Sequence, residues 1–126
     1  ANDLLKQFRV EPKISVLSGG RLKDIGRSKL VDKSIIEADA LAKKYAVKHA
    51  QILIENAVID SNFILAPDGI SGNLIYRTLI HLGGGSSHGA LYYPLAINNT
   101  IIVDTSRAAP KEEYISSIAL ANAIKN

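Results

Sequence analysis

The sequence predicts an α/β protein with three layers (α/β/α), in which a mainly parallel sheet is covered by helices on both faces. Short runs rich in β-branched and other apolar residues alternate along the chain with longer amphipathic stretches. Turn-forming residues, mainly glycine, proline and asparagine, separate the two kinds of segment. Strands that alternate with helices form βαβ units, and these units build a parallel sheet.

Length and composition fit one folded domain. The chain has 126 residues, and 47% of them are apolar, which suffices for a hydrophobic core. It contains no methionine and starts Ala1-Asn2-Asp3, so we expect it to be part of a longer protein. No internal repeat divides it, and residues 1–126 are predicted to form a single α/β domain.

Composition also excludes several classes of protein. The net charge is +3, and the basic residues are scattered, so no nucleic-acid partner is expected. No apolar run approaches the length of a membrane span, and no signal peptide opens the chain. The absence of cysteine excludes disulfides, thiolate metal sites and a cysteine nucleophile, and fits a cytoplasmic protein. Three scattered histidines form no metal-binding pattern, so no metal is expected.

Residues 1–27 are expected to form a helix, a strand and a loop. Residues 1–12 predict a short helix that ends before a proline, and Lys13–Leu17 predicts a strand. The glycine-rich loop that follows carries Arg21 and Arg27. It is either a flexible connection or a loop that contacts phosphate at the carboxyl end of a strand.

The next helix is predicted to begin at Ser34. Ser34 and Glu37 have the spacing of a capping box, and the helix is expected to run to about Ala46. A strand at Gln51–Ile54 should follow. The apolar positions expected to face the sheet from this helix are Ile35, Ala38, Leu41, Ala42 and Tyr45.

The central stretch runs from Phe63 to Gly85. Phe63–Ala66 predicts a third strand, a glycine-hinged turn follows it, and a helix is expected from Gly72 to Leu82, stopped by glycines. A strand, a glycine-rich turn and a helix N-terminus together are a common anion site, and the other interpretation is a plain helix cap. The turn residues that we take as candidate ligands are Asp68, Gly69, Ser71, Gly72 and Asn73, with Asp68 favoured as a cap.

The last third predicts two strands and a helix. Residues 90–96 and Thr100–Asp104 are the strand candidates, with Thr100–Val103 expected in the same sheet as the earlier strands. Pro110 should set the first turn of the final helix. Its inner face is expected to carry Ile115, Ile118, Ala119 and Asn122.

Chemistry is expected where the Thr100–Asp104 strand ends. Ser106 and Arg107 can offer a hydroxyl and a bidentate guanidinium to a phosphate, or Arg107 can pair with Asp104 or a helix end. Glu113 is either a partner of the helix dipole or, if it points at Ser106 and Arg107, a general base. His49 is interpreted as a surface residue.

The order of these motifs resembles the C-terminal half of the phosphate acyltransferases, such as phosphotransacetylase and phosphotransbutyrylase. The motifs are KISVLS, AQILIENAVIDSN, FILAPDGISGNLIYRTLIHLGGG and IIVDTSRAA. Within that family the chain resembles a small methanogen-specific archaeal branch, the methanogenesis-marker family labelled as the methyltransferase MtxX. The resemblance implies a fold like isocitrate and isopropylmalate dehydrogenases, a homodimer, and a C-terminal portion of a two-domain protein.

The resemblance also implies an activity. The reaction would convert acyl-CoA and phosphate to acyl phosphate and coenzyme A, with coenzyme A as a substrate and no other cofactor. Ser106 and Arg107 would face the cleft, and Glu113 would stand where the family has an aspartate that takes the thiol proton. Two alternatives stay open, namely methyl transfer from S-adenosylmethionine or a corrinoid, and a non-catalytic protein that binds phosphate or coenzyme A.

Overall fold

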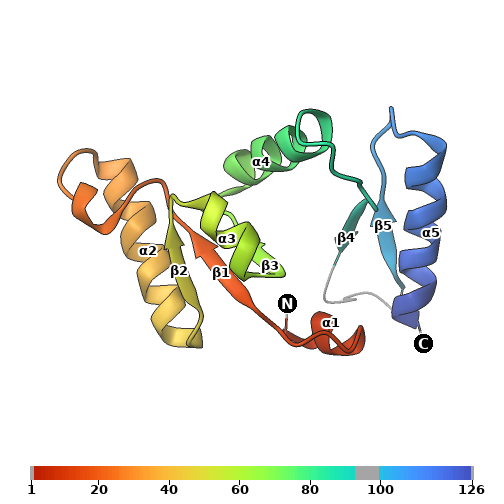
Figure 1. Ribbon diagram of the computed structural model, residues 1–126, viewed down its shortest axis with the longest axis horizontal. Helices are drawn as coiled ribbons and strands as arrows, with labels where there is room; N and C mark the ends of the chain where they lie inside the picture. Colours follow the sequence, from red (N-terminus) through yellow and green to blue (C-terminus); the bar gives the residue numbers. More distant parts are fainter. Residues whose placement is uncertain (1, 93–99, 126) are drawn as a thin grey trace. The chain divides into compact units, whose positions relative to one another are not determined.

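The computed structural model describes residues 2–92 and 100–125 (Figure 1). This part of the chain forms five α-helices, one 3-10 helix and five strands, so the predicted α/β class is confirmed. The chain divides into two compact units, Ala1–Tyr76 and Arg77–Asn126, and each is described by itself. No helix in the described residues is long and apolar enough to cross a membrane.

The first unit is built on a three-stranded parallel sheet. Its elements are α1 (Asn2–Gln7), β1 (Ile14–Leu17), η1 (Leu22–Asp24), α2 (Lys29–Tyr45), β2 (Lys48–Gln51), α3 (Ile54–Asp60), β3 (Phe63–Leu65) and the first part of α4 (Gly69–His81). The strand order is β2-β1-β3, with Val16 opposite both His49 and Leu65. The predicted strands at Lys13–Leu17 and Phe63–Ala66 are confirmed.

Helices cover both faces of this sheet. The strands β2 and β3 lie on opposite sides of β1, so right-handed connections place α2 and α3 on opposite faces. The helix α2 packs against β1 and β2, and α3 packs against β2. A core cluster of Leu17, Ala50 and Ala57 is joined by Ile54 from α3 and Ile75 from α4. The predicted arrangement of helix, sheet and helix is therefore present.

The predicted start of α2 is wrong. The helix begins at Lys29 after Ser28, and Ser34 lies inside it. The hydroxyl of Ser34 donates to the carbonyl of Val31 at 2.9 Å and accepts the amide of Gly19 at 2.8 Å. The side chain of Val31 already lies against the loop after β1, so burial extends the helix upstream, and its cap is Ser28 rather than Ser34. The predicted inward position of Tyr45 is also wrong, since this residue is 60% exposed.

The predicted strand at Gln51–Ile54 is wrong, because the strand begins three residues earlier in the chain. The strand is Lys48–Gln51, and Gln51 ends it with a φ of 58°. The apolar run after Gln51 instead opens α3, a helix that the sequence did not predict, with Ile54 packed on the core. The strand itself was missed because three of its four residues, Lys48, His49 and Gln51, are polar.

The helix α4 begins at Gly69, and the prediction that it begins after Gly72 is wrong. The carboxylate of Asp68 accepts the Ser71 amide at 2.8 Å and the Ser71 hydroxyl at 3.0 Å. The Gly72 amide donates to the Asp68 carbonyl at 3.0 Å, which is an ordinary helical bond. The prediction that Asp68 caps this helix is confirmed.

The second unit contains the end of α4, β4 (Ala90–Tyr92), β5 (Ile102–Asp104) and α5 (Lys111–Lys125). The helix α4 ends at His81, and the glycines after it bond back to its last carbonyls, as predicted. The strands β4 and β5 pair antiparallel in a sheet of their own. The prediction that Thr100–Val103 joins the parallel sheet is therefore wrong. Residues 93–96, at the end of the predicted strand 90–96, lie outside the described residues.

The buried face of α5 carries two polar residues and one apolar residue, and the predicted inner face is wrong. Ile115 is 57% and Ile118 is 70% exposed, whereas Glu113, Ser117 and Ile124 are buried. These three buried positions lie along one side of the helix, which packs against β5. The contact of Glu113 with the loop after β5 favours this orientation of the helix over one that would bury Ile115 and Ile118.

Candidate functional site

The loop between β5 and α5 and the first turn of α5 carry the three residues that the sequence predicts as catalytic, Ser106, Arg107 and Glu113. The carboxylate of Glu113 is buried and accepts the amide of Ser106 at 3.4 Å. The Tyr114 hydroxyl donates to the Ser106 carbonyl at 3.4 Å, and the Ala108 amide donates to the Ser106 hydroxyl at 3.4 Å. The first turn of α5 thus contacts the loop, and Glu113 points at Ser106, which is the geometry that the general-base alternative needs.

Arg107 is exposed beside this contact. Within residues 2–92 and 100–125 its guanidinium forms no ion pair, so the alternative in which it pairs with Asp104 is not observed. An unpaired guanidinium has five donors in a planar fork that matches phosphate and carboxylate. The loop therefore presents an exposed cation, Arg107, a few residues before the buried carboxylate of Glu113 in α5.

The turn after β3 is less suited to an external anion than the sequence suggests. The carboxylate of Asp68 occupies the N-terminus of α4, and its pKa is lowered by the backbone amide and then the hydroxyl of Ser71. The amide of Gly72 is used inside the helix, whereas Gly69 and Asn73 are exposed. The strands β3 and β5 belong to different sheets, so the turn after β3 and the loop with Ser106 do not follow strands of one sheet as expected.

The glycines after β1 have a packing role. A Cβ on Gly20 would lie 2.8 Å from Cγ1 of Val31, and one on Gly19 would lie 3.0 Å from Oγ of Ser34. Glycine is therefore required for the loop to approach α2 this closely. The side chain of Arg21 is exposed, and its amide donates to Asp24 at 2.8 Å. No contact of this loop points to phosphate rather than to packing.

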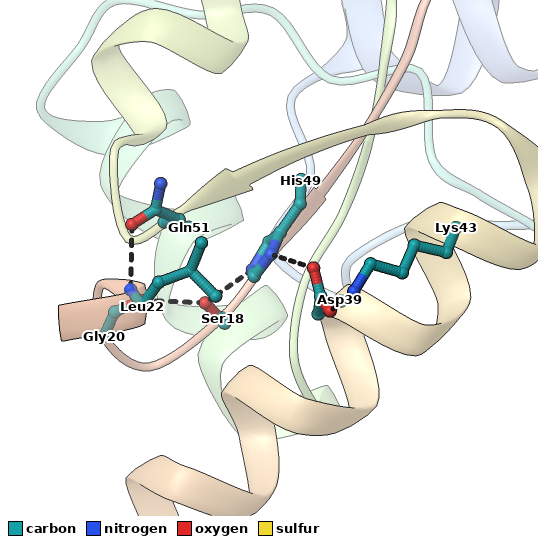
Figure 2. A network of polar contacts seen from close by, with 7 residues as sticks. All are labelled: Ser18, Gly20, Leu22, Asp39, Lys43, His49 and Gln51. Atoms are coloured by element: carbon teal, nitrogen blue, oxygen red, sulfur yellow. Dashed lines mark hydrogen bonds and ion pairs between the residues drawn. The ribbon is translucent and has the colours of Figure 1, made fainter. Parts of the chain in front are cut away.

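A polar network that the sequence did not predict joins β1, β2 and α2 (Figure 2). The hydroxyl of Ser18 lies 3.0 Å from Nε2 of His49, and Nδ1 of His49 lies 3.7 Å from the carboxylate of Asp39. Lys43 pairs with Asp39 at 2.6 Å and is the main cause of the lowered pKa of that carboxyl. The prediction that His49 is a surface residue is wrong, because its side chain is only 9% exposed.

The order serine, histidine and aspartate is that of a nucleophile and its base, but the geometry favours a structural role. Ser18 is 2% exposed, and its only proton is donated to the carbonyl of Gly20 at 2.9 Å. The distance from Nδ1 of His49 to Asp39 exceeds that of a hydrogen bond. We interpret the network as a clamp that holds α2 on the sheet. Placing β2 at Lys48–Gln51 would have shown that His49 lies on the buried part of a strand.

No cluster of histidine and carboxylate side chains suited to a metal ion occurs in the described part of the chain. The exposed polar groups of the loop after β5 that could contact a ligand are chiefly the Arg107 guanidinium and the Ser106 hydroxyl. Both groups are exposed and free of ionic partners in that part.

Comparison with known proteins finds relatives along nearly the whole chain. A Methanosarcina mazei protein is 45% identical over 97% of the chain and 44% of its own length. A Methanosarcina acetivorans protein is 45% identical over 95% of the chain and 43% of its own length. Both are named "Putative methyltransferase mtx subunit X". A Methanocaldococcus jannaschii protein named as an uncharacterized methyltransferase is 41% identical over 94% of the chain and 50% of its own length.

The chain resembles these methyltransferase-named proteins along nearly its whole length. It spans about half the length of the curated relatives that it matches. No family model matches it, and no solved structure does. The predicted resemblance to the MtxX proteins is confirmed, and the wider resemblance to the phosphate acyltransferases stays a prediction.

Proposed function

We propose that the chain is the substrate-binding part of a transferase. Arg107 binds an anionic group of one substrate, and the Ser106 hydroxyl forms a hydrogen bond to the substrate next to its reacting atom. Glu113 accepts or donates a proton at the same place. The observation that carries the proposal is the buried carboxylate of Glu113 held on the amide of Ser106, next to an unpaired guanidinium. A base fixed beside an anion site is the arrangement that activation of a bound nucleophile needs.

Methyl transfer is the activity that the names of the relatives favour. A methyl group would pass from a sulfonium donor such as S-adenosylmethionine to a thiol. The carbon–sulfur bond of the donor breaks, the new bond forms to the thiol sulfur, and the thiol proton passes to Glu113. Arg107 would hold a carboxylate, sulfonate or phosphate on either substrate. Because thiolate is the better nucleophile, removal of this proton speeds the transfer.

Phosphate acyl transfer is the second candidate, and the order of Ser106, Arg107 and Glu113 along the chain favours it. A phosphate oxygen would attack the thioester carbonyl of acyl-CoA, giving acyl phosphate and the free thiol of coenzyme A. The phosphate proton ends on the departing sulfur, and Glu113 can relay it. Arg107 and the Ser106 hydroxyl would stabilise the charge that develops on the phosphate and the carbonyl oxygen.

One experiment separates the two activities. The full-length protein is incubated either with acyl-CoA and phosphate or with S-adenosylmethionine labelled in its methyl group and a thiol acceptor. A methyl-corrinoid serves as a second methyl donor. Label in the thioether would support methyl transfer, and phosphate-dependent release of free thiol would support acyl transfer. Binding of either donor without turnover would favour the non-catalytic alternative.

We also propose that the protein works as an assembly, as a homodimer in the simplest case. The helix α4 buries none of its residues fully, and Ile70 and Leu74 are 77% and 64% exposed. Exposed apolar residues gathered on one helix are typical of a protein–protein contact. The word "subunit" in the names of the relatives is in keeping with an assembly.

A further inference from the structure

The carboxyl ends of β1 and β3 open toward a crevice. After β1 the chain passes to α2 on one face of the sheet. After β3 it passes to α4, whose Ile75 packs with Leu17 and Ala57 on the face covered by α3. Two neighbouring parallel strands thus send their connections to opposite faces. In open α/β sheets such a switch of direction is where ligands bind.

A pocket of about 210 Å³ lies at this point. All of its walls belong to the first unit. They are Val16 and Leu17 of β1, Ser34, Glu37, Ala38 and Leu41 of α2, and Leu65, Ala66 and Pro67 at the end of β3. A cavity of about 150 Å³ lined by apolar side chains admits benzene, so this pocket has room for one larger ring system. It does not reach the buried hydroxyl of Ser18, which is absent from its walls.

The polar groups of the walls define what the pocket can recognise. Seven of the nine wall residues are apolar. The hydroxyl of Ser34 is committed to Val31 and Gly19. Glu37 is therefore the wall residue that offers free acceptor atoms, because its contact with Lys33 is a long one of 3.7 Å between exposed side chains.

We propose that this pocket binds a flat heteroaromatic base with an amino group, of the adenine class. The apolar walls would cover the ring, and the amino group would donate to the carboxylate of Glu37. The carboxylate disfavours phosphate at the same place, so the base and not the phosphate end enters. For the identity of the ligand this inference rests on the proposed function, since S-adenosylmethionine and coenzyme A both carry adenine.

Calorimetric titration of the protein with adenosine tests the proposal. Purine riboside, which lacks the amino group, is the matched ligand. Glu37→Ala and Glu37→Gln are the test variants, and Glu55→Gln, on the exposed side of α3, is the control. Adenosine should bind saturably to the wild type and to Glu55→Gln. Glu37→Ala should weaken it about tenfold, the usual worth of one hydrogen bond to a charged group. Glu37→Gln should weaken it less, because its amide oxygen still accepts.

Comparing both ligands on the wild type and on Glu37→Ala isolates the hydrogen bond between the amino group and Glu37. Purine riboside should bind more weakly than adenosine to the wild type and equally to the wild type and Glu37→Ala. The proposal is overturned if the folded wild type does not bind adenosine, or if adenosine binds equally to all variants. Titrations with S-adenosylmethionine and coenzyme A then show which donor supplies the base. Phosphate binding through Arg107, measured in the same samples, should be unchanged in Glu37→Ala, so failure of either proposal is seen separately.

Discussion

The imidazole of His49 and the hydroxyl of Ser18 meet at 3.0 Å across the two adjacent strands β2 and β1. Both side chains are almost fully covered, and Asp39 of α2 lies on the other side of the imidazole ring. Through Asp39, the same imidazole also connects the sheet to α2, the helix that carries one wall of the pocket at the ends of β1 and β3. It therefore bears on stability, and on the pocket, rather than on the loop that carries Ser106.

Removing either partner of this contact should destabilise the fold. We expect Ser18→Ala and His49→Ala each to lower the free energy of unfolding by about 1–3 kcal/mol, because a buried polar group is left without its partner. Urea unfolding followed by circular dichroism measures this. His88→Ala, which changes an exposed loop histidine, should have an effect of less than about 0.5 kcal/mol. Lost transferase activity in Ser18→Ala with unchanged stability would show that the serine is catalytic instead.

The same substitution should have opposite effects at two glycines. Gly20→Ala places a Cβ 2.8 Å from Val31 and 3.2 Å from Ile35, so it should cost about 1–3 kcal/mol of stability through overpacking. Gly69→Ala meets nothing within 4 Å in the first turn of α4, and should stabilise by about 0.5–1 kcal/mol. Thermal unfolding of both variants checks this. Equal effects would show that the loop after β1 has freedom to move away from α2.

The cap of α4 should make stability depend on pH in the acid range. The hydrogen bonds from Ser71 lower the pKa of Asp68 in the folded state. Its contribution is therefore complete above the unfolded pKa of about 4, and is lost as the pH falls through the lower folded value. Asp68→Asn keeps an acceptor for the Ser71 amide and should remove this part of the pH dependence. Unfolding midpoints between pH 2 and 6, compared for the two proteins, measure it. Identical slopes would contradict the assignment.

Self-association should depend on the exposed residues of α4. Ile70→Glu combined with Leu74→Glu should shift a dimer toward the monomer, because each charge would have to be buried on contact. Light scattering over a range of protein concentrations follows this. Ile118→Glu, which alters the exposed face of α5, tests whether that face contributes instead. A wild type that is monomeric at the highest concentration would contradict the proposed homodimer.

Local signals in the sequence were sufficient for some elements. The apolar runs of β1 and β3, the Asp68 cap and the glycine stop of α4 each depend on residues next to one another in the chain. The contact between Glu113 and Ser106 could be anticipated as one of two alternatives, because only seven positions separate them. The α/β class followed from the alternation of these elements.

Elements decided by tertiary contacts could not be predicted in the same way. Ser28 precedes α2 and Ser34 lies inside it, and either could cap a helix. Only the contact of Ser34 with Gly19 shows that Ser34 is not the cap. The strand β2 carries polar residues that pair with three different elements, His49 with Asp39 of α2, Lys48 with Asp60 of α3 and Gln51 with the Leu22 amide of η1. The orientation of α5 follows from the buried Glu113, against the apolar pattern of Ile115 and Ile118. Pairing of β5 with β4 depends on residues far apart in the chain, which no local pattern records.

The central claim is that Arg107 binds the anionic part of a substrate beside Glu113, and calorimetric titration of the full-length protein tests it most directly. Phosphate and coenzyme A are titrated into the wild type, Arg107→Ala, Arg107→Lys and the control Arg77→Ala. We expect Arg107→Ala to weaken binding by about 1.5–3 kcal/mol, as for a charge-assisted hydrogen bond. Arg107→Lys should restore part of this loss, because the bidentate fork is missing. Arg77→Ala should bind as the wild type does. Equal affinities of all four proteins for both ligands would contradict the account.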